Sequence, residues 1–417
     1  MPKESWFKTY IYIWIGQFVS LLTSSAVNFA VIIYLSLHYK SAEVLAFAGI
    51  AGLLPQAIIG PFAGVYIDRW DRKKVMIYAD AFIALCTFMM SFAFVEGEAN
   101  LAFVYALLVC RSLGQAFHTP AMQAIAPLIV PEEKLLKVSG INQMLQSVSM
   151  IAGPAVGTLA ITYMPISKVL YLDVIGAMLA IVSLMFVVIP KLNAQPTAEN
   201  NISTVLMDLK LGFGEIHKNK GLYLLFVYAM LTTFFVMPVA IMYPLLTIEH
   251  FAGGKWEMSI IEVMWGAGML VGGGILSAWK GSVSKVILVN AMHIFLGVTF
   301  VFSGWISGDL FWVFVAITTL GGIGMSFFNA SFMTIIQEEI KPEFLGRVFS
   351  MYFSFAIIPS VIGLLFTGWI ADEIGVVNAF IIGGSAMCFV GLLSFVTPAV
   401  MNLGKNRKIE LSSEEEK

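Results

Sequence analysis

Long apolar stretches alternate with short polar intervals along almost the whole chain. Twelve stretches are nearly free of charge, and each can supply the roughly 20 helical residues that cross a hydrocarbon core. They cover residues 10–35, 45–67, 75–95, 101–122, 139–163, 169–189, 222–247, 259–279, 286–304, 310–333, 348–370 and 377–401. Backbone polar groups in lipid must pair internally, so such stretches form helices or a closed barrel. Because they lack the polar–apolar alternation of barrel strands, the pattern predicts an all-α polytopic membrane protein with 12 transmembrane helices.

Composition and the distribution of charge agree with this prediction. The chain has 417 residues, of which 59% are hydrophobic and 12% charged, against about 25% charged residues in soluble domains. If the N-terminus is cytoplasmic, nearly all of the 24 Lys and Arg fall on the cytoplasmic side; Lys40, Lys168 and Lys255 lie outside, and Arg111 lies within a span. Such a bias sets orientation. It predicts a multi-pass protein of the cell membrane with both termini cytoplasmic.

A long polar interval divides the chain into two halves. We predict a six-helix bundle over residues 1–192, a cytoplasmic linker over 193–221, a second six-helix bundle over 222–402 and a cytoplasmic tail over 403–417. Within the linker, Leu206, Leu209, Phe213 and Ile216 recur at helical spacing. Such an amphipathic segment is expected to lie along the inner membrane surface, although a simple tether between the halves is the plainer alternative.

The two halves resemble each other at an offset near 210 residues. Gly114 and Phe117 in the fourth predicted span correspond to Gly324 and Phe327 in the tenth. Pseudo-symmetric halves of this kind are typical of transporters in which two bundles surround a central path and rock to open it to either side. Chance similarity between apolar helices is the alternative explanation.

A charged sequence follows the second predicted span. Gly64 precedes Asp68 by one helical turn, and the basic residues Arg69, Arg72 and Lys73 follow. This run resembles motif A of the major facilitator superfamily, in which such charges form a gate at the inner ends of the helices. A positively charged loop facing the cytosol and anionic lipid would show similar charges. The corresponding part of the second half has no acid, so the resemblance implies a stronger gate in the first half.

Arg111 lies in the middle of the fourth predicted span. A charge at that depth costs roughly 2.5–3.5 kcal/mol on insertion scales, so it requires a partner or a water-filled cavity. The run from Arg111 to Gln115 resembles motif B of the same superfamily, with its Gln and Gly transposed. That resemblance implies a role in proton coupling or substrate binding. A structural Arg, paired with backbone carbonyls or with Asn28, is the alternative.

The fifth predicted span contains Gly153, Pro154 and Gly157. Proline removes a helix hydrogen bond and bends the segment. The run resembles antiporter motif C of the superfamily, with Ser149 and Thr158 replacing two glycines, and this favours export over import. Ordinary packing of a kinked helix is the alternative.

Other residues carry a narrower resemblance: Gly16, Gln17 and Ser20 of the first predicted span, Pro55, the run from Gly60 to Lys73, and the start of the third span from Val75 to Asp80. Together they are similar to the drug–proton antiporter branch that includes macrolide efflux proteins and siderophore exporters.

Few acids lie within the predicted spans, and one of them would have to bind the transported proton. We expect Asp80 to pair with Arg69 or Arg72, and Asp173 to be a shallow acid on a peripheral helix. Asp80 and Asn28 are also candidates, with Arg111 and Glu262, for the proton-coupling residues of the cavity. Glu262 is the first choice for a proton-carrying acid, because a partly desolvated carboxyl binds and releases protons near neutral pH. The intramembrane histidines, His118 and His293, are expected to be packed residues.

The favoured function is a secondary active transporter: a proton-coupled exporter of hydrophobic drugs such as macrolides that works by alternating access. The glycine clusters lie in apolar spans and lack the Lys-Ser/Thr of a nucleotide loop, so the proton gradient is the expected energy source, with no cofactor. The three cysteines lack metal-ligand spacing. We expect no enzyme activity, no nucleic-acid partner and a monomer in contact with membrane lipid. A carrier of the same fold for a siderophore, a lysophospholipid or a nutrient is the alternative, and a membrane enzyme or receptor is a more distant one.

Overall fold

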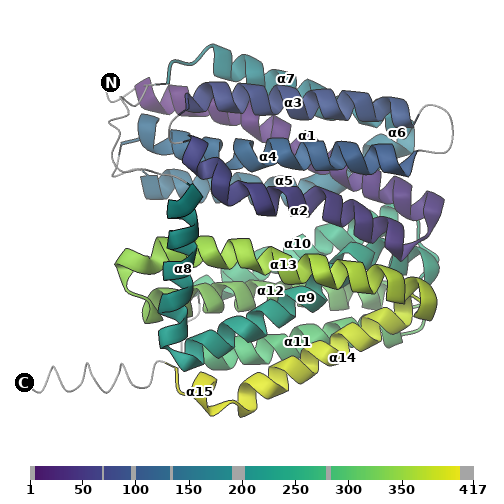
Figure 1. Cartoon of the computed structure of the whole chain (residues 1–417). Coiled ribbons are helices and arrows are strands. Elements are labelled where there is room, and N and C mark those ends of the chain that lie inside the picture. Colours follow the sequence, from purple (N-terminus) through teal and green to yellow (C-terminus); the bar gives the residue numbers. More distant parts are fainter. Residues whose placement is uncertain are drawn as a thin grey trace, which may run out of the picture. The chain divides into compact units, whose positions relative to one another are not determined.

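The chain folds into helices throughout the part that the structure describes. A computed structural model describes residues 5–67, 70–94, 100–131, 135–189, 202–278 and 283–403. All regular elements in these ranges are helices, which confirms the predicted fold class (Figure 1). Among the described residues, 11 helices are long and apolar enough to cross a membrane. The remaining predicted span, 348–370, lies in α13 (Pro342–Ile374), where the described apolar run covers Phe355–Phe366.

The first compact unit comprises residues 1–40, 47–205 and 254–263. Its helices are α1 (Ser5–Tyr39), α2 (Ala42–Ile67), α3 (Arg72–Ala93), α4 (Leu101–Ile129), α5 (Leu135–Tyr163), α6 (Ile166–Val169) and α7 (Tyr171–Met185). Helix α1 packs against α5 and α7, and α3 packs against α4 and α7. Figure 1 shows these long helices running alongside one another. Apolar side chains such as Trp14, Met76 and Ile125 form a core among them.

Helix α3 begins at a well-defined cap. The Asp71 carboxylate accepts hydrogen bonds from the backbone N–H groups of Lys73 and Lys74 at 3.1 and 3.3 Å. An aspartate in this position satisfies amides that have no partner within the helix. The predicted charged loop therefore ends at Asp71, and Arg72 and Lys73 form the first turn of α3.

The second compact unit comprises residues 41–46, 206–253 and 264–417. Its helices are α8 (Ile202–Lys218), α9 (Lys220–Glu249), α10 (Lys255–Ala278), α11 (Lys285–Trp305), α12 (Phe311–Glu339), α13, α14 (Val376–Val396) and α15 (Pro398–Met401). The division falls near the start of α8 and within α10. Helix α11 packs against α12 and α14, and α9 packs against α13 and α14.

The amphipathic segment of the predicted linker is helix α8. Ile216 is buried and joins the core formed by Leu222 and Phe226 of α9, whereas Leu211 and Phe213 are exposed. Asn219 separates the two helices; its side chain caps α9 and donates a 2.9 Å hydrogen bond to Glu339. Figure 1 shows α8 running crosswise to α9. This direction agrees with the prediction that the segment follows the plane of the membrane, which stays a prediction.

Helices α11 and α14 approach each other so closely that they require glycine. A Cβ atom added to Gly297 would lie 2.5 Å from the carbonyl oxygen of Gly384, and one added to Gly384 would lie 2.6 Å from that of Gly297. Small residues allow helix backbones in membranes to come into direct contact. The second unit therefore depends at this interface on the absence of side chains.

We expect Gly384→Ala to lower the stability of the protein by about 1–3 kcal/mol, the usual cost of overpacking a close-packed core. Thermal unfolding of the purified protein in detergent measures this change. Gly383→Ala is the matched control, because a Cβ there meets only Val239 Cγ2 at an ordinary 3.4 Å. Equal unfolding temperatures for the two variants would contradict the close contact.

Candidate functional site

Polar side chains in the first unit form two layers across the helix bundle. Each of α1, α3 and α4 contributes two of them, seven residues apart: Gln17 and Ser24, Asp80 and Thr87, Arg111 and His118. Seven residues make about two helical turns, or about 10.5 Å, and place both side chains of a pair on one face of the helix. One layer contains Arg111 with Asp173 of α7, and the other contains Asp80 with His118.

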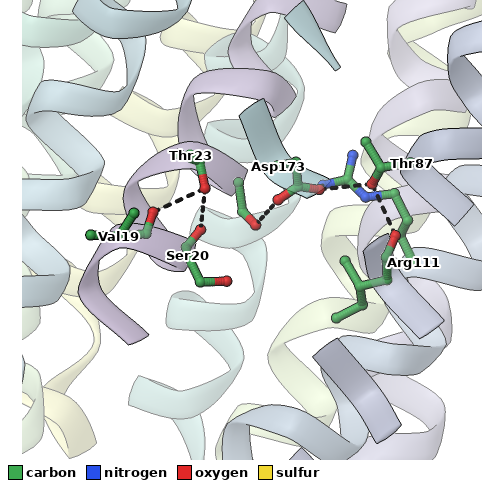
Figure 2. Close-up of polar contacts among 8 residues, drawn as sticks. Val19, Ser20, Thr23, Thr87, Arg111 and Asp173 are labelled. Carbon is green, nitrogen blue, oxygen red and sulfur yellow. Dashed lines mark hydrogen bonds and ion pairs between the residues drawn. The ribbon is translucent and has the colours of Figure 1, made fainter. Parts of the chain in front are cut away.

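The Arg111–Asp173 layer is a buried ion pair with two further donors. Arg111 Nη2 lies 2.9 Å from Asp173 Oδ2, and the two side chains are 7% and 0% exposed. Thr87 donates a 2.7 Å hydrogen bond to the same oxygen, and Ser24 donates to Asp173 Oδ1 (Figure 2). Charge-assisted hydrogen bonds of this kind are the strong ones. Four helices thus converge on one carboxylate.

The Asp80–His118 layer contains fewer donors. His118 Nε2 lies 3.1 Å from Asp80 Oδ1, and Gln17 donates a 3.2 Å hydrogen bond to Asp80 Oδ2. The side chains of Asp80, His118 and Gln17 are all buried. His118 Nε2 and Gln17 Oε1 make no hydrogen bond among the described residues, so the histidine and the carboxylate are close without being aligned as donor and acceptor.

These contacts correct the expected partners of both charged residues. Asp80 contacts His118 and Gln17, whereas Arg72 donates a 2.7 Å hydrogen bond to the carbonyl oxygen of Ala124. Arg69, the other expected partner of Asp80, lies outside the described residues.

Arg111 pairs with Asp173 and not with Asn28, which is exposed. Asp173 itself is fully buried. The signal that could have found it is the cost of Arg111 in mid-membrane, which calls for a buried acid on a neighbouring helix.

Neither Glu262 nor His293 takes part in the contacts of the two layers. Glu262, on α10, is half-buried and has no ion-pair or hydrogen-bond partner among the described contacts. His293, on α11, is fully buried and packs against Phe328 with ring centroids 5.0 Å apart, as expected for a packed histidine. Neither ring nitrogen of His293 has a hydrogen-bond partner in the described part of the chain.

The side chain of Ser112, next to Arg111, enters the backbone of α2. Its hydroxyl donates a 2.7 Å hydrogen bond to the carbonyl oxygen of Gly52 and accepts one of 3.1 Å from the N–H of Gln56. In a regular helix these two backbone groups would bond to each other. The hydroxyl therefore bridges one step of the α2 hydrogen-bond ladder, beside Pro55, and inserted groups of this kind are a common cause of helix bends.

The described basic residues of the expected gate bind backbone carbonyls. Lys73 Nζ donates to the carbonyl oxygens of Val187 at 2.7 Å and Met185 at 3.3 Å, at the end of α7. The last carbonyls of a helix have no partner within it, so Lys73 completes α7. Gly64 lies in α2, and Asp68 lies outside the described residues.

The glycines of the motif-C-like run face α1 across a close helix contact. A Cβ at Gly153 would lie 2.5 Å from Ser25 Cβ, and one at Gly157 would lie 2.3 Å from the carbonyl oxygen of Ala26. Pro154 lies inside α5, which continues through it. These residues hold α5 against α1, the helix that contributes Gln17 and Ser24 to the two layers.

No cluster of three or more metal-ligating side chains occurs among the described residues. Cys86, Cys110 and Cys388 are free thiols.

Apolar helices of membrane-spanning length, together with charges buried in mid-bundle, define a polytopic α-helical membrane protein. The chain belongs to the Major Facilitator Superfamily, whose sequence pattern matches residues 13–352. It is therefore a transporter of that family and was correctly recognised from its motifs.

Two relatives and one solved structure illustrate the similarity. The chain is 35% identical to macrolide efflux protein A of Streptococcus pyogenes over 408 residues, which cover 98% of this chain and 99% of that protein. It is 36% identical to macrolide efflux protein A of Enterococcus faecalis over 324 residues, 78% of this chain and 99% of that protein. The fold is similar to a variant of the nucleoside transporter NupG, with a TM-score of 0.74 at 13% identity over 93% of this chain and 99% of that one.

We expect Arg111→Met or Asp173→Asn alone to destabilise the protein by about 3–5 kcal/mol, because each removes one partner of a buried ion pair. The double variant should lose less than the sum of the two, since no unpaired charge remains. Thermal unfolding of all four proteins in detergent completes the cycle. Strictly additive losses would contradict a direct pair.

Lys73→Gln should lower stability by about 0.3–1 kcal/mol, the usual contribution of a cation at a helix C-terminus. Lys74→Gln is the matched control, since Lys74 is the next residue in the first turn of α3 and its side chain is exposed. Unfolding temperatures in detergent compare the two. If Lys74→Gln has the larger effect, Lys73 does not stabilise the end of α7.

Proposed function

We propose that this transporter exports macrolide-like hydrophobic compounds from the cell in exchange for protons. The observation on which the proposal depends is its similarity to macrolide efflux protein A, at 35% identity over nearly the full length of both chains. The run of Gly153, Pro154 and Gly157, which resembles the antiporter motif, also favours export. On this proposal the protein is a multi-pass monomer of the cell membrane with both termini in the cytoplasm.

The proposed energy source is the proton gradient. Transport against a concentration gradient needs a coupled energy source, and ionisable residues within membrane spans are typical of proton pathways. The two buried ionic layers of the first unit supply such residues, whereas most of the remaining span surface is apolar. Arg111 would act here by keeping the carboxylate of Asp173 charged within the bundle.

The proposed mechanism is alternating access, in which the six-helix halves rock about the substrate. Asp68, Arg69, Arg72 and Lys73 would control closure at the cytoplasmic ends of the helices. The contact of Ser112 with α2 supports a connection between the two regions, because α2 extends from that contact to Gly64. A change at Arg111 could thereby reach the expected gate along α2.

Everted membrane vesicles that contain the protein should accumulate a radiolabelled macrolide when their interior is made acidic. With one proton exchanged per substrate, a gradient of about one pH unit sustains about a tenfold substrate gradient. A protonophore should abolish this accumulation, and vesicles without the protein are the control.

Two other results would change the proposal. Accumulation that persists with the protonophore would exclude proton coupling. Absence of macrolide transport, together with gradient-driven movement of a siderophore, a lysophospholipid or a nutrient, would replace the substrate class.

A further inference from the structure

We propose that the Asp80–His118 layer is the proton-binding site of the transport cycle. The Arg111–Asp173 layer does not change its net charge during that cycle. This inference rests on the proposed proton coupling and assigns it to particular residues. It differs from the assignment that the sequence favours, in which Glu262 binds the proton.

The two layers differ in the nature of the cation. Arg111 is permanently charged in proteins, so its pairing with Asp173 leaves that layer neutral. Histidine exists in both neutral and charged forms near physiological pH. The Asp80–His118 layer can therefore bind or release one proton, with a change in its net charge, while the other layer does not.

The number of donors points the same way. Asp173 receives donors from three side chains, Arg111, Thr87 and Ser24. Asp80 receives one hydrogen bond, from Gln17, and lies 3.1 Å from His118. A buried charge without hydrogen bonds or a counter-charge is costly in free energy. Binding of a proton therefore relieves a larger cost at the carboxylate with fewer donors.

Burial makes proton binding favourable in this layer. With His118 neutral, Asp80 would leave a net negative charge in a site where both side chains are buried. Binding of one proton, on either residue, produces a neutral layer. Gln17 Oε1, itself fully buried and without a described hydrogen bond, can accept from a newly protonated group. Release of the proton requires that the layer become more hydrated, which a conformational change of the bundle would provide.

The other charged groups on the surrounding helices already have partners or lie far away along the helix. No Asp, Glu, Lys or Arg occurs in residues 9–37 of α1, 44–65 of α2, 139–163 of α5 or 174–185 of α7. Several charged or titratable groups on α1, α3, α4 and α7 have described partners: Tyr10, which donates to Asn142; Arg72 and Lys73, which bind backbone carbonyls; and the pair Arg111–Asp173. The thiols Cys86 and Cys110 also lie on these helices, and Tyr12 on α1 and Lys74 on α3 are exposed. Tyr78, on α3, is 69% exposed.

The second half lacks an equivalent site. At the offset of 210 residues, Asp80, Thr87, Arg111 and His118 correspond to Asn290, Gly297, Gly321 and Phe328. Asn290 accepts a 2.7 Å hydrogen bond from Ser394, and Gly297 and Gly321 lie in close helix contacts. None of these four residues can change its charge, so the described layers of the first unit have no ionisable counterpart at these positions.

Asp80→Asn and His118→Gln should separate transport from the proton gradient. In proteoliposomes with an imposed gradient of about one pH unit, the wild-type protein should concentrate a radiolabelled macrolide about tenfold, and both variants should reach only equal concentrations. Exchange of labelled for unlabelled macrolide at a uniform pH should continue in both, because it needs no net proton movement. His293→Gln is the control, since His293 is a buried histidine without an acidic partner.

The outcomes separate this inference from the proposed function. If the wild-type protein ignores the pH gradient, proton coupling itself fails. If the wild type responds and both variants still concentrate the macrolide as the wild type does, the proton site lies elsewhere, and Glu262→Gln then tests the acid on α10.

A second measurement does not depend on transport. The imidazole NMR signal of His118, identified in nitrogen-15-labelled protein by its loss in His118→Gln, should change between about pH 5 and 9 if the layer binds and releases a proton. Asp80→Asn should alter this pH dependence, because it removes the anion beside the ring. A signal that is constant over this range, or unaffected by Asp80→Asn, would overturn the inference even if either variant folds too poorly to transport.

Discussion

The first unit depends on one constraint: a guanidinium inside an apolar bundle must have a carboxylate beside it. Arg111 is 7% exposed and Asp173 is fully buried, so neither charge can be neutralised by water. Breaking such a pair is far more costly than breaking one at a surface. The ion pair connects α7 to α4, while α7 packs against α1 and α3. The hydroxyls of Ser24 on α1 and Thr87 on α3 donate the remaining hydrogen bonds to the Asp173 carboxylate. The contacts that compensate the charge of Asp173 are therefore also contacts that hold α1, α3, α4 and α7 together.

Both units use close packing at glycines, and the first unit adds a buried ion pair. In lipid, apolar surface gives little driving force for one helix to prefer another, so close packing and polar contacts decide. The second unit uses close packing between α11 and α14, where Gly297 and Gly384 bring backbones into contact. At positions that the internal repeat makes equivalent, the first unit has Thr87 and Arg111 where the second has Gly297 and Gly321.

The sequence predicts the helices well and their neighbours poorly, for a physical reason. Apolar length and charge bias report how far a segment extends through lipid, and they correctly predict the positions of almost all the long helices. They fail at Thr397, where an unbroken apolar run divides into α14 and α15 because Pro398 has no N–H to continue the helix. They also do not report which face of one helix meets which face of another.

For that reason the sequence predicts Asp173 on a peripheral helix and a pair between Asp80 and Arg69 or Arg72, whereas Asp173 is buried beside Arg111 and the described contacts of Asp80 are with His118 and Gln17. The seven-residue spacing of polar side chains in α1, α3 and α4 was present in the sequence, but only the packing shows that the three patterns coincide. The Arg111–Asp173 pair and the Asp80–His118 pair lie about two helical turns apart. The proposed assignment gives helix association to the first pair and proton binding to the second, whereas a single buried acid would have to serve both. Arg111 and Asp173 can hold the helices together whatever the pH, because arginine does not lose its charge. On the proposed assignment of the proton site, a change of charge at Asp80 and His118 leaves this contact in place. Helices α1, α3 and α4 each contribute a residue to both layers. On the proposed mechanism, a change of charge in one layer therefore alters the helix packing around the other layer.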